Sequence, residues 1–282
     1  MPIIDVYAAT DLILVLAFAI IAGSAHARDL SPREKKDAAV QFLKSLESKD
    51  SKALKYVDPD KYIQHNLHVE DGLPGVRKLL ASLPGDTKVD VVRTLADGDF
   101  VVTHTEYDFF GPKVGFDIFR FENGKIVEHW DNLEAKCQRP NASGRTQTDG
   151  PTEIKDLDKT ETNKALLKEY FEVVVIGGHR DQASRFRDKF HQHNCFGEDN
   201  KSGAQATSGP FAKPGFVYKV NKVHRVLGEG NFVLVVNEGS FDDKPSIFYD
   251  FYRVENAMIV EHWDVIEEIP PVDQWKNKNG KV

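Results

Sequence analysis

The chain has 282 residues, which is long for one domain and enough for two domains of about 110–130 residues each. Its 37 basic and 44 acidic residues give a formal net charge of −7, which argues against a nucleic-acid partner. The overall composition is that of an ordinary globular protein. Any function must therefore be read from particular residues and motifs.

The N-terminus has the pattern of a secretory signal peptide. Residues 12–22 form an apolar run, and Ala-His-Ala at 25–27 fits an A-x-A cleavage site. The run is shorter than the roughly 20 apolar residues of a membrane-spanning helix. Asp5 and Asp11 precede it without any lysine or arginine, so an uncleaved anchor or a different start codon are the alternatives. We expect cleavage after Ala27, a secreted or periplasmic location and no stable membrane span.

Two helices followed by four strands are predicted in the first half. Apolar residues at i, i+3, i+4 and i+7 mark one helix across residues 39–46 and another across 76–83. Strand patterns follow at 89–95, 100–107, 115–122 and 125–133, and Asn123-Gly124 predicts a tight hairpin turn. This order indicates an α+β domain whose antiparallel sheet curls around the helices and leaves a cone-shaped cavity.

The second half repeats the first. Residues 126–131, Ile-Val-Glu-His-Trp-Asp, recur unchanged at 259–264, which is 133 positions later (264 − 131). The stripe at 39–46 recurs at 167–174, only 128 positions later, so five residues entered the middle of the second copy. Glycines and prolines between 202 and 215 predict that its second helix is lost or shortened. Strands are again expected at 218–227, 232–238, 247–255 and 258–266.

The predicted organisation is a signal peptide at 1–27, a first domain at 28–137, a linker at 138–159, a second domain at 160–270 and a tail at 271–282. The two cysteines, Cys137 and Cys195, could pair in an exported chain, but free or buried thiols are an equal alternative. Asn141 and Asn200 match the N-glycosylation triplet, which matters only in an exported eukaryotic protein.

Several motifs recur at matching places in both copies. The first copy has Tyr-Ile-Gln-His-Asn at 62–66, Asp-Gly at 71–72, Asp-Ile-Phe-Arg at 117–120, Glu-Asn-Gly-Lys at 122–125 and the shared hexapeptide. The second has Phe-His-Gln-His-Asn at 190–194, Asp-Phe-Tyr-Arg at 250–253, Glu-Asn at 255–256 and the hexapeptide again. With these motifs the chain resembles, twice over, the SnoaL-like polyketide cyclase family within the nuclear transport factor 2-like superfamily.

The resemblance implies two tandem cone-shaped domains whose apolar cavities accept small molecules. Members of the family close polyketide rings by intramolecular aldol condensation, with an acidic residue in the cavity as general acid/base. The superfamily also contains isomerases, dehydratases, epoxide hydrolases and non-catalytic domains, so the fold alone does not fix the reaction. Single-domain relatives often pair through their sheets, which implies an intramolecular pseudo-dimer here and allows a further homo-oligomer.

Strand alternation supplies the candidate catalytic residues of the first copy. If the faces carrying them line the cavity, five titratable side chains converge there: His65, His104, Asp117, His129 and Asp131. A carboxyl group in an apolar pocket is suited to moving a proton near neutral pH, and Asn66 could donate a hydrogen bond to a developing enolate. The alternatives are ligand binding without chemistry, or a structural network in which residues 64–66 bond the backbone and Asp131 pairs with a histidine or Arg120.

The second copy keeps most of this set as candidate binding residues: His193, Asn194, Asp250, His262 and Asp264. Val236 replaces His104, so we expect a more apolar pocket and assign activity to the first copy. Trp130 and Trp263 alternate with the histidines and are expected at an interface. Histidines and aspartates could ligate zinc or iron, but no compact ligand spacing is visible, so no metal and no cofactor are expected.

The sequence therefore predicts cofactor-independent acid/base chemistry, an aldol-type cyclisation or an isomerisation, on a small apolar carbonyl compound. The alternative is a non-catalytic protein that binds a small apolar ligand or acts as a scaffold.

Overall fold

The computed structural model describes residues 28–201 and 213–282. The predicted signal peptide, and residues 202–212 of the segment where the second copy was expected to lose a helix, lie outside the described residues. Among the helices of the described ranges, none is both long and apolar enough to cross a membrane.

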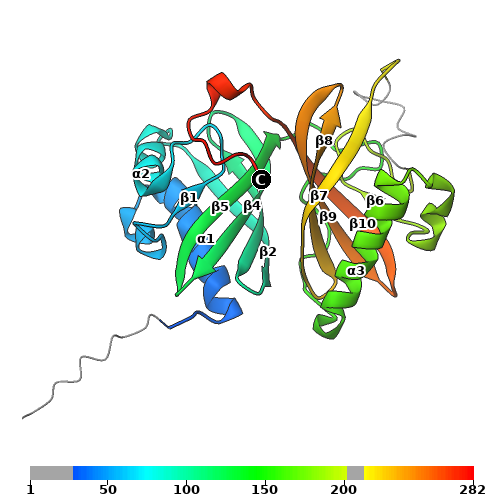
Figure 1. Cartoon of the computed structure of the whole chain (residues 1–282), viewed down its shortest axis with the longest axis horizontal. Helices are drawn as coiled ribbons and strands as arrows, with labels where there is room; N and C mark the ends of the chain where they lie inside the picture. Colours follow the sequence, from blue (N-terminus) through cyan, green and yellow to red (C-terminus); the bar gives the residue numbers. More distant parts are fainter. Residues whose placement is uncertain (1–27, 202–212) are drawn as a thin grey trace, which may run out of the picture.

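The first domain consists of two helices and one curved sheet (Figure 1). Helix α1 begins after a capping box in which Ser31 and Glu34 satisfy each other's backbone N–H groups, with proline at its first turn. The elements in chain order are α1 (Pro32–Ser48), η1 (Ser51–Tyr56), β1 (Ile63–Gln64), α2 (Gly72–Ser82), β2 (Lys88–Asp97), β3 (Phe100–Asp108), β4 (Pro112–Glu122) and β5 (Lys125–Ala135). The strand order β1-β5-β4-β3-β2 places β5 between β4 and the parallel β1.

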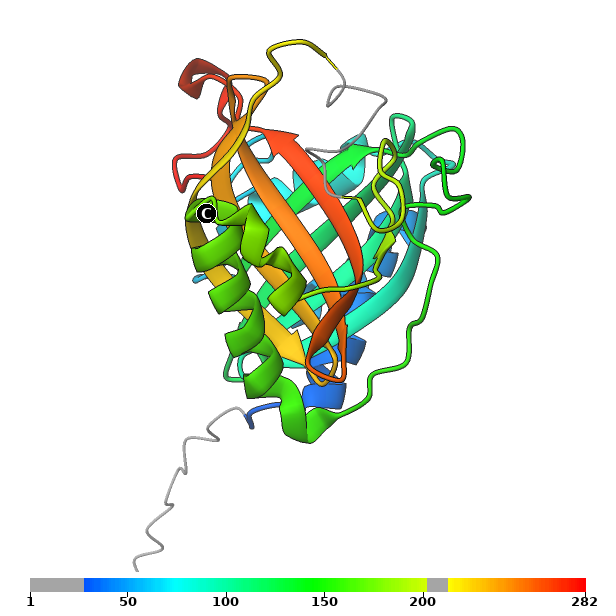
Figure 2. The ribbon, with the colours of Figure 1, turned by 90° about the vertical axis from the view of Figure 1, so that its right-hand side faces the viewer.

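The second domain has the same strand order, β6-β10-β9-β8-β7. Its elements are η2 (Leu157–Lys159), α3 (Thr160–Tyr170), the π-helical turn η3 (Phe171–Ile176), η4 (Arg180–Arg185), β6 (His191–Gln192), β7 (Tyr218–Glu229), β8 (Phe232–Phe241), β9 (Lys244–Glu255), β10 (Met258–Glu268) and η7 (Val272–Gln274). Figure 2 shows α3 lying across the outer face of this sheet. The predicted α+β class and all eight long strands are confirmed, while the two-residue strands β1 and β6 were not predicted.

Each sheet has a helix-covered face and a face turned toward the other sheet (Figure 1). The helix-covered face of the first sheet packs Phe119 against Phe42 of α1. The opposite faces of the two sheets share one buried apolar cluster that includes Trp130, Trp263 and Phe251. The expectation that both tryptophans lie at an interface is therefore confirmed.

Two segments cross from one domain to the other, and we call them the first arm (residues 136–151) and the second arm (residues 269–282). The first arm follows β5 but packs on the second domain, where Cys137 forms a disulfide with Cys195. The second arm follows β10 but packs on the first domain, where Asn277 Nδ2 donates to the Asn66 carbonyl over 2.8 Å. Asn141 of the first arm donates in the matching way to the Asn194 carbonyl. The two arms are thus exchanged between the domains.

Candidate functional site

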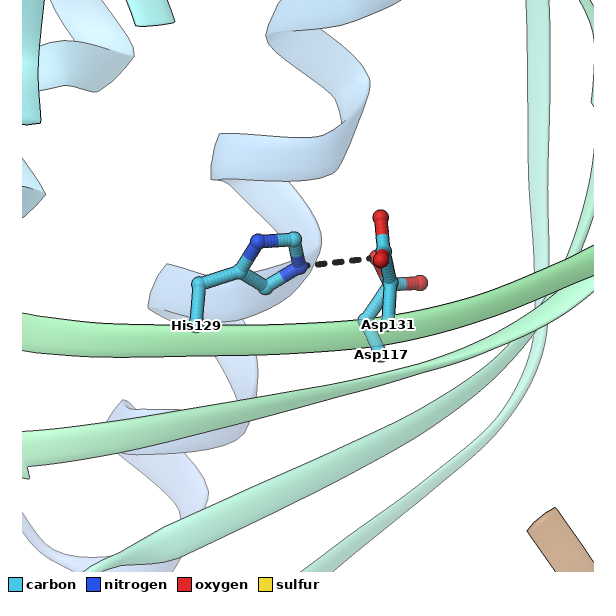
Figure 3. Close-up of side chains that lie close together, drawn as sticks. All are labelled: Asp117, His129 and Asp131. Carbon is cyan, nitrogen blue, oxygen red and sulfur yellow. Dashed lines mark hydrogen bonds and ion pairs between the residues drawn. The ribbon is translucent and has the colours of Figure 1, made fainter. Parts of the chain in front are cut away.

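The helix-covered face of the first sheet carries a cluster of Asp117, His129 and Asp131 (Figure 3). Asp117 on β4 lies opposite Asp131 on β5, and His129 is two residues before Asp131 on the same face. Their ligand atoms lie within 4.8 Å of one another. His129 Nε2 is 3.0 Å from Asp117 Oδ1. Strand register therefore brings together Asp117, His129 and Asp131, three of the five residues that the sequence predicted to converge.

Gln64 determines that the Nδ1 atom of His129 carries a proton. Gln64 Oε1 accepts from the Asn66 backbone N–H over 2.8 Å, which orients the amide. His129 Nδ1 lies 3.1 Å from the same oxygen and must donate to it. The remaining ring nitrogen faces the Asp117 carboxyl group. His129 and Asp117 therefore share one proton in the bond between Nε2 and Oδ1.

The cluster of the first domain is closed off by other polar side chains. Tyr107 and Thr103 both donate to Asp117 Oδ2. Asp117 is 3% exposed and Asp131 is 4% exposed, which leaves little surface for a ligand. Burial, with the charge of Asp117 next, raises the pKa of Tyr107 well above its usual value, so its hydroxyl stays a proton donor.

The second arm inserts a cation beside Asp131. Lys281 Nζ lies 3.3 Å from Asp131 Oδ1 and 2.9 Å from Glu267 Oε1, and the lysine is 4% exposed. Burial acts to raise the pKa of Asp131, but the charges of Lys281 and His129 outweigh it and hold this pKa below its usual value. Asp131 is therefore an ionised partner of a buried lysine.

The second domain repeats the triad as Asp250, His262 and Asp264, whose ligand atoms also lie within 4.8 Å. His262 Nε2 is 3.0 Å from Asp250 Oδ1, and its Nδ1 is 3.1 Å from Gln192 Oε1. Asn194 Nδ2 donates to Asp264 over 2.9 Å. Burial opposes protonation of His262, but the Asp250 hydrogen bond and the charges of both aspartates raise its pKa above the usual value.

This second triad lines a cavity of about 760 Å³ beside α3, η3 and β7. Strands β3 and β8 correspond with an offset of 132 (232 − 100), and they differ beside the acid. Gly239 takes the place of Tyr107, whose hydroxyl donates to the acid of the first domain. Asn237, at the place of Thr105, donates instead to Asp250 over 2.8 Å. The second triad therefore faces a volume suited to a small organic ligand.

The second triad also lacks the buried lysine. At the position that corresponds to Lys281, the first arm places neutral Gln147, which donates to Glu134 of β5. Burial and the charge of Asp264 raise the pKa of Glu134 to about 8. Burial likewise raises the pKa of Asp264, despite the opposing charge of His262. The arms thus place a buried lysine beside the acids of the first cluster and a neutral glutamine beside those of the second.

The predicted convergence of five residues is wrong for two of them. His104 pairs with Phe116 across the sheet, stacks on it at 4.2 Å and lies on the face between the domains. His65 stacks on Trp130 at 4.7 Å, and its Nδ1 donates to the Gly280 carbonyl. Neither side chain reaches Asp117, because strand alternation turns both to the other face.

His193 of the second copy is displaced in the same way. It stacks on Trp263 at 4.5 Å and binds Glu261 and Asp149 of the first arm. By contrast Asn66 and Asn194 donate to Asp131 and Asp264 as hydrogen-bonding members of the clusters.

Four groups of the clusters were not foreseen: Gln64 with Gln192, Tyr107, Glu134 with Glu267, and Lys281. The glutamines belong to the repeated Gln-His-Asn motif and could have been found from it.

Each triad also has the donor types of a metal site, one histidine and two carboxylates. Its histidine already bonds one carboxylate directly, so an ion would have to replace that proton. The absence of a metal remains a prediction.

Comparison with known proteins identifies the first domain. Residues 39–129 match the family model described as SnoaL-like domain. No curated protein matches the chain. Similar solved structures include TsrD from Streptomyces laurentii (22% identity, TM-score 0.34, 38% of this chain and 92% of that chain), an LEH-like epoxide hydrolase from M. tuberculosis (20%, 0.33, 36% and 84%) and a candidate polyketide cyclase from Bacillus cereus (18%, 0.32, 36% and 74%). Residues 39–129 therefore form a SnoaL-like domain.

Proposed function

We propose that the second domain is a further SnoaL-like copy and that its cavity performs cofactor-independent acid/base chemistry on a small apolar carbonyl compound. The observation that carries this proposal is the triad of Asp250, His262 and Asp264 on the wall of the 760 Å³ cavity. This reverses the expectation that the first copy is active. In the first domain, Tyr107 binds Asp117 and Lys281 binds Asp131, which favours a structural role for that triad.

Asp264 is the proposed general acid/base. Burial raises its pKa above the usual value, which makes its carboxylate a stronger base, and the hydrogen bond from Asn194 orients it. In the reaction, the Asp264 carboxylate takes a proton from the carbon next to the substrate carbonyl. The electron pair of that C–H bond moves to the carbonyl oxygen and forms an enolate. The protonated pair of His262 and Asp250 lies beside this site and offsets the new negative charge.

Two outcomes follow from the enolate. In an isomerisation, Asp264 returns the proton to another carbon of the conjugated system. In an aldol-type cyclisation, the enolate carbon attacks a second carbonyl group, and the new alkoxide takes the proton from Asp264. Both reactions balance without a redox cofactor, and both require the same first proton transfer.

Proton exchange tests this first step without knowledge of the natural product. The mature chain is incubated in D2O with phenylacetone, 2-tetralone and 1-(2-naphthyl)propan-2-one, and loss of the α-proton signals is followed by NMR. We expect catalysed exchange of at least one ketone and a drop of about 10²–10⁴-fold in Asp264→Asn. The matched variant Asp131→Asn in the first triad retains the exchange rate. Ketone binding without exchange supports the non-catalytic binding function instead.

We also propose that the chain is exported and cleaved after Ala27. The disulfide between Cys137 and Cys195 supports this, because such bonds persist in oxidising compartments. The intact mass of the protein from its native source tests the proposal. A chain that begins at Arg28 and is lighter by the two hydrogen atoms lost in forming one disulfide is expected, whereas a full-length reduced chain contradicts it.

A further inference from the structure

An arginine on the cavity wall lacks part of its usual set of partners. The Arg187 guanidinium lies over the ring of Phe190, with its central carbon 4.5 Å from the ring centroid, and binds Tyr170. Its Nε is buried and has no hydrogen-bond partner within the described residues. This nitrogen has almost no accessible surface, so a ligand would meet the part of the half-buried Arg187 side chain that lines the cavity.

Several other arginines of the described chain pair with carboxylates. Arg253 Nε lies 2.6 Å from Glu261, Arg120 Nε lies 2.7 Å from Glu128, and Arg145 binds Asp199. No such ion pair is seen for Arg187 in residues 28–201 and 213–282. An arginine that is held on a cavity wall by an aromatic ring, without a carboxylate partner, is a common binding group for the carboxylate of a ligand.

The charges around the cavity favour an anion. Two acids, Asp250 and Asp264, line the cavity, and Asp250 is offset by its proton-sharing partner His262. Arg187 is near enough for its charge to lower the pKa of His262, against the larger effects that raise it. At the outer wall, exposed Arg180 and Lys219 add two positive charges. The arginine therefore keeps a charge that a ligand carboxylate could neutralise.

The remaining walls are apolar, as a hydrocarbon body would require. Phe171, Val174, Val220 and Ile259 line the interior, and the exposed Ile176 lies among the lining residues. This feature belongs to the second copy alone, because Pro59 occupies the position of Arg187 in the first (187 − 128).

We propose that the ligand of the second cavity is an amphipathic organic acid, whose carboxylate binds Arg187 and whose apolar body extends toward Asp250 and His262. The inference rests on the proposed function for its location and adds the class of substrate, an apolar keto acid. The carboxylate anchors the molecule at Arg187. Its carbonyl-bearing carbon is then presented to the triad.

Matched acid and amide ligands test the proposal. Binding of 2-naphthylacetate and 2-naphthylacetamide is measured by isothermal titration calorimetry at pH 7. These molecules share one apolar body and differ in charge. A charge-assisted hydrogen bond at Arg187 predicts that the wild-type chain prefers the acid by about 10- to 100-fold. Arg187→Gln loses this preference and keeps its affinity for the amide. Arg187→Lys retains a reduced preference, because it keeps the charge but not the planar donor pair.

Arg185→Gln is the matched control, since Arg185 is nearby in the chain but exposed and paired with Glu169. It retains the wild-type preference. Equal affinity for acid and amide, a preference that survives Arg187→Gln, or failure of every acid from phenylacetate to 2-naphthylacetate to bind would each overturn the proposal. Asp264→Asn separates this result from the proposed chemistry: it abolishes ketone exchange and retains the preference for the acid.

Discussion

Lys281 allows a quantitative test of the exchanged arms. Its ammonium group lies 3.3 Å from Asp131 and 2.9 Å from Glu267, and only 4% of the residue is exposed. Lys281→Met removes the charge and keeps most of the apolar side chain. Two carboxylates then lie in a buried site without their cation. Breaking a buried ionic group in this way costs about 3–5 kcal/mol, and solvent screens little of it here.

The change of stability with pH should have opposite directions in the wild-type chain and in the Lys281→Met variant. The pKa of Asp131 is below its usual value in the folded chain, so its contribution to stability is present above about pH 4 and is lost as pH falls further. Without Lys281, the folded-state pKa of Asp131 rises above that of the unfolded chain, and the pKa of Glu267, which burial already raises beside Lys281, rises further. The variant then loses stability as pH rises through these values. The free energy of unfolding of the variant should be close to that of wild type near pH 4 and well below it at pH 7–8.

Urea unfolding of the two chains at pH 4.5 and pH 7.5 measures this difference. Lys278→Met is the control, because Lys278 belongs to the same arm and is exposed. We expect it to change the free energy of unfolding by less than about 0.5 kcal/mol. Two results would contradict an inserted Lys281: equal effects of the two substitutions on the free energy of unfolding, or a loss of stability in Lys281→Met that does not grow with pH.

Three further predictions concern single contacts. The pKa of Glu134 is raised to about 8, so its ionisation opposes folding as pH rises from about 4.5 to 8. Glu134→Gln should therefore be more stable than wild type by about 2–4 kcal/mol at pH 8 and by much less at pH 5. Urea unfolding at the two pH values measures this difference. Tyr107→Phe removes a buried donor from Asp117 and should cost about 1–3 kcal/mol by the same assay, while ketone exchange persists. Cys137→Ser opens a disulfide that spans 58 positions and should lower the free energy of unfolding by about 4 kcal/mol, whereas an unchanged thermal midpoint would contradict a structural disulfide.

The sequence predicted the strands well because each has a strong local pattern of apolar side chains. It could not decide which faces combine, since that depends on register between strands. Alternation correctly grouped His129 with Asp131, but the pairing of Thr103 with Asp117 puts His104 on the other face. The face on which His104 lies thus depends on the pairing between strands, which the sequence of one strand does not determine.

The position of the cavity was also beyond sequence reasoning. An additional histidine favoured the first copy, yet Tyr107 donates to the acid of that copy, and Gly239 stands at its position in the copy that has the cavity. Lys281 belongs to an arm without helix or strand periodicity, so its docking on the opposite domain left no pattern to read. Gln64 was present in a repeated motif and was visible in advance.

The central claim is that ligand binds at the second triad. A crystal structure of the mature chain with 2-tetralone tests it most directly. We expect ligand density in the cavity beside Asp250, His262 and Asp264, with Lys281 still beside Asp131 of the first triad. Density at Asp117 and His129, with Lys281 displaced, would contradict it.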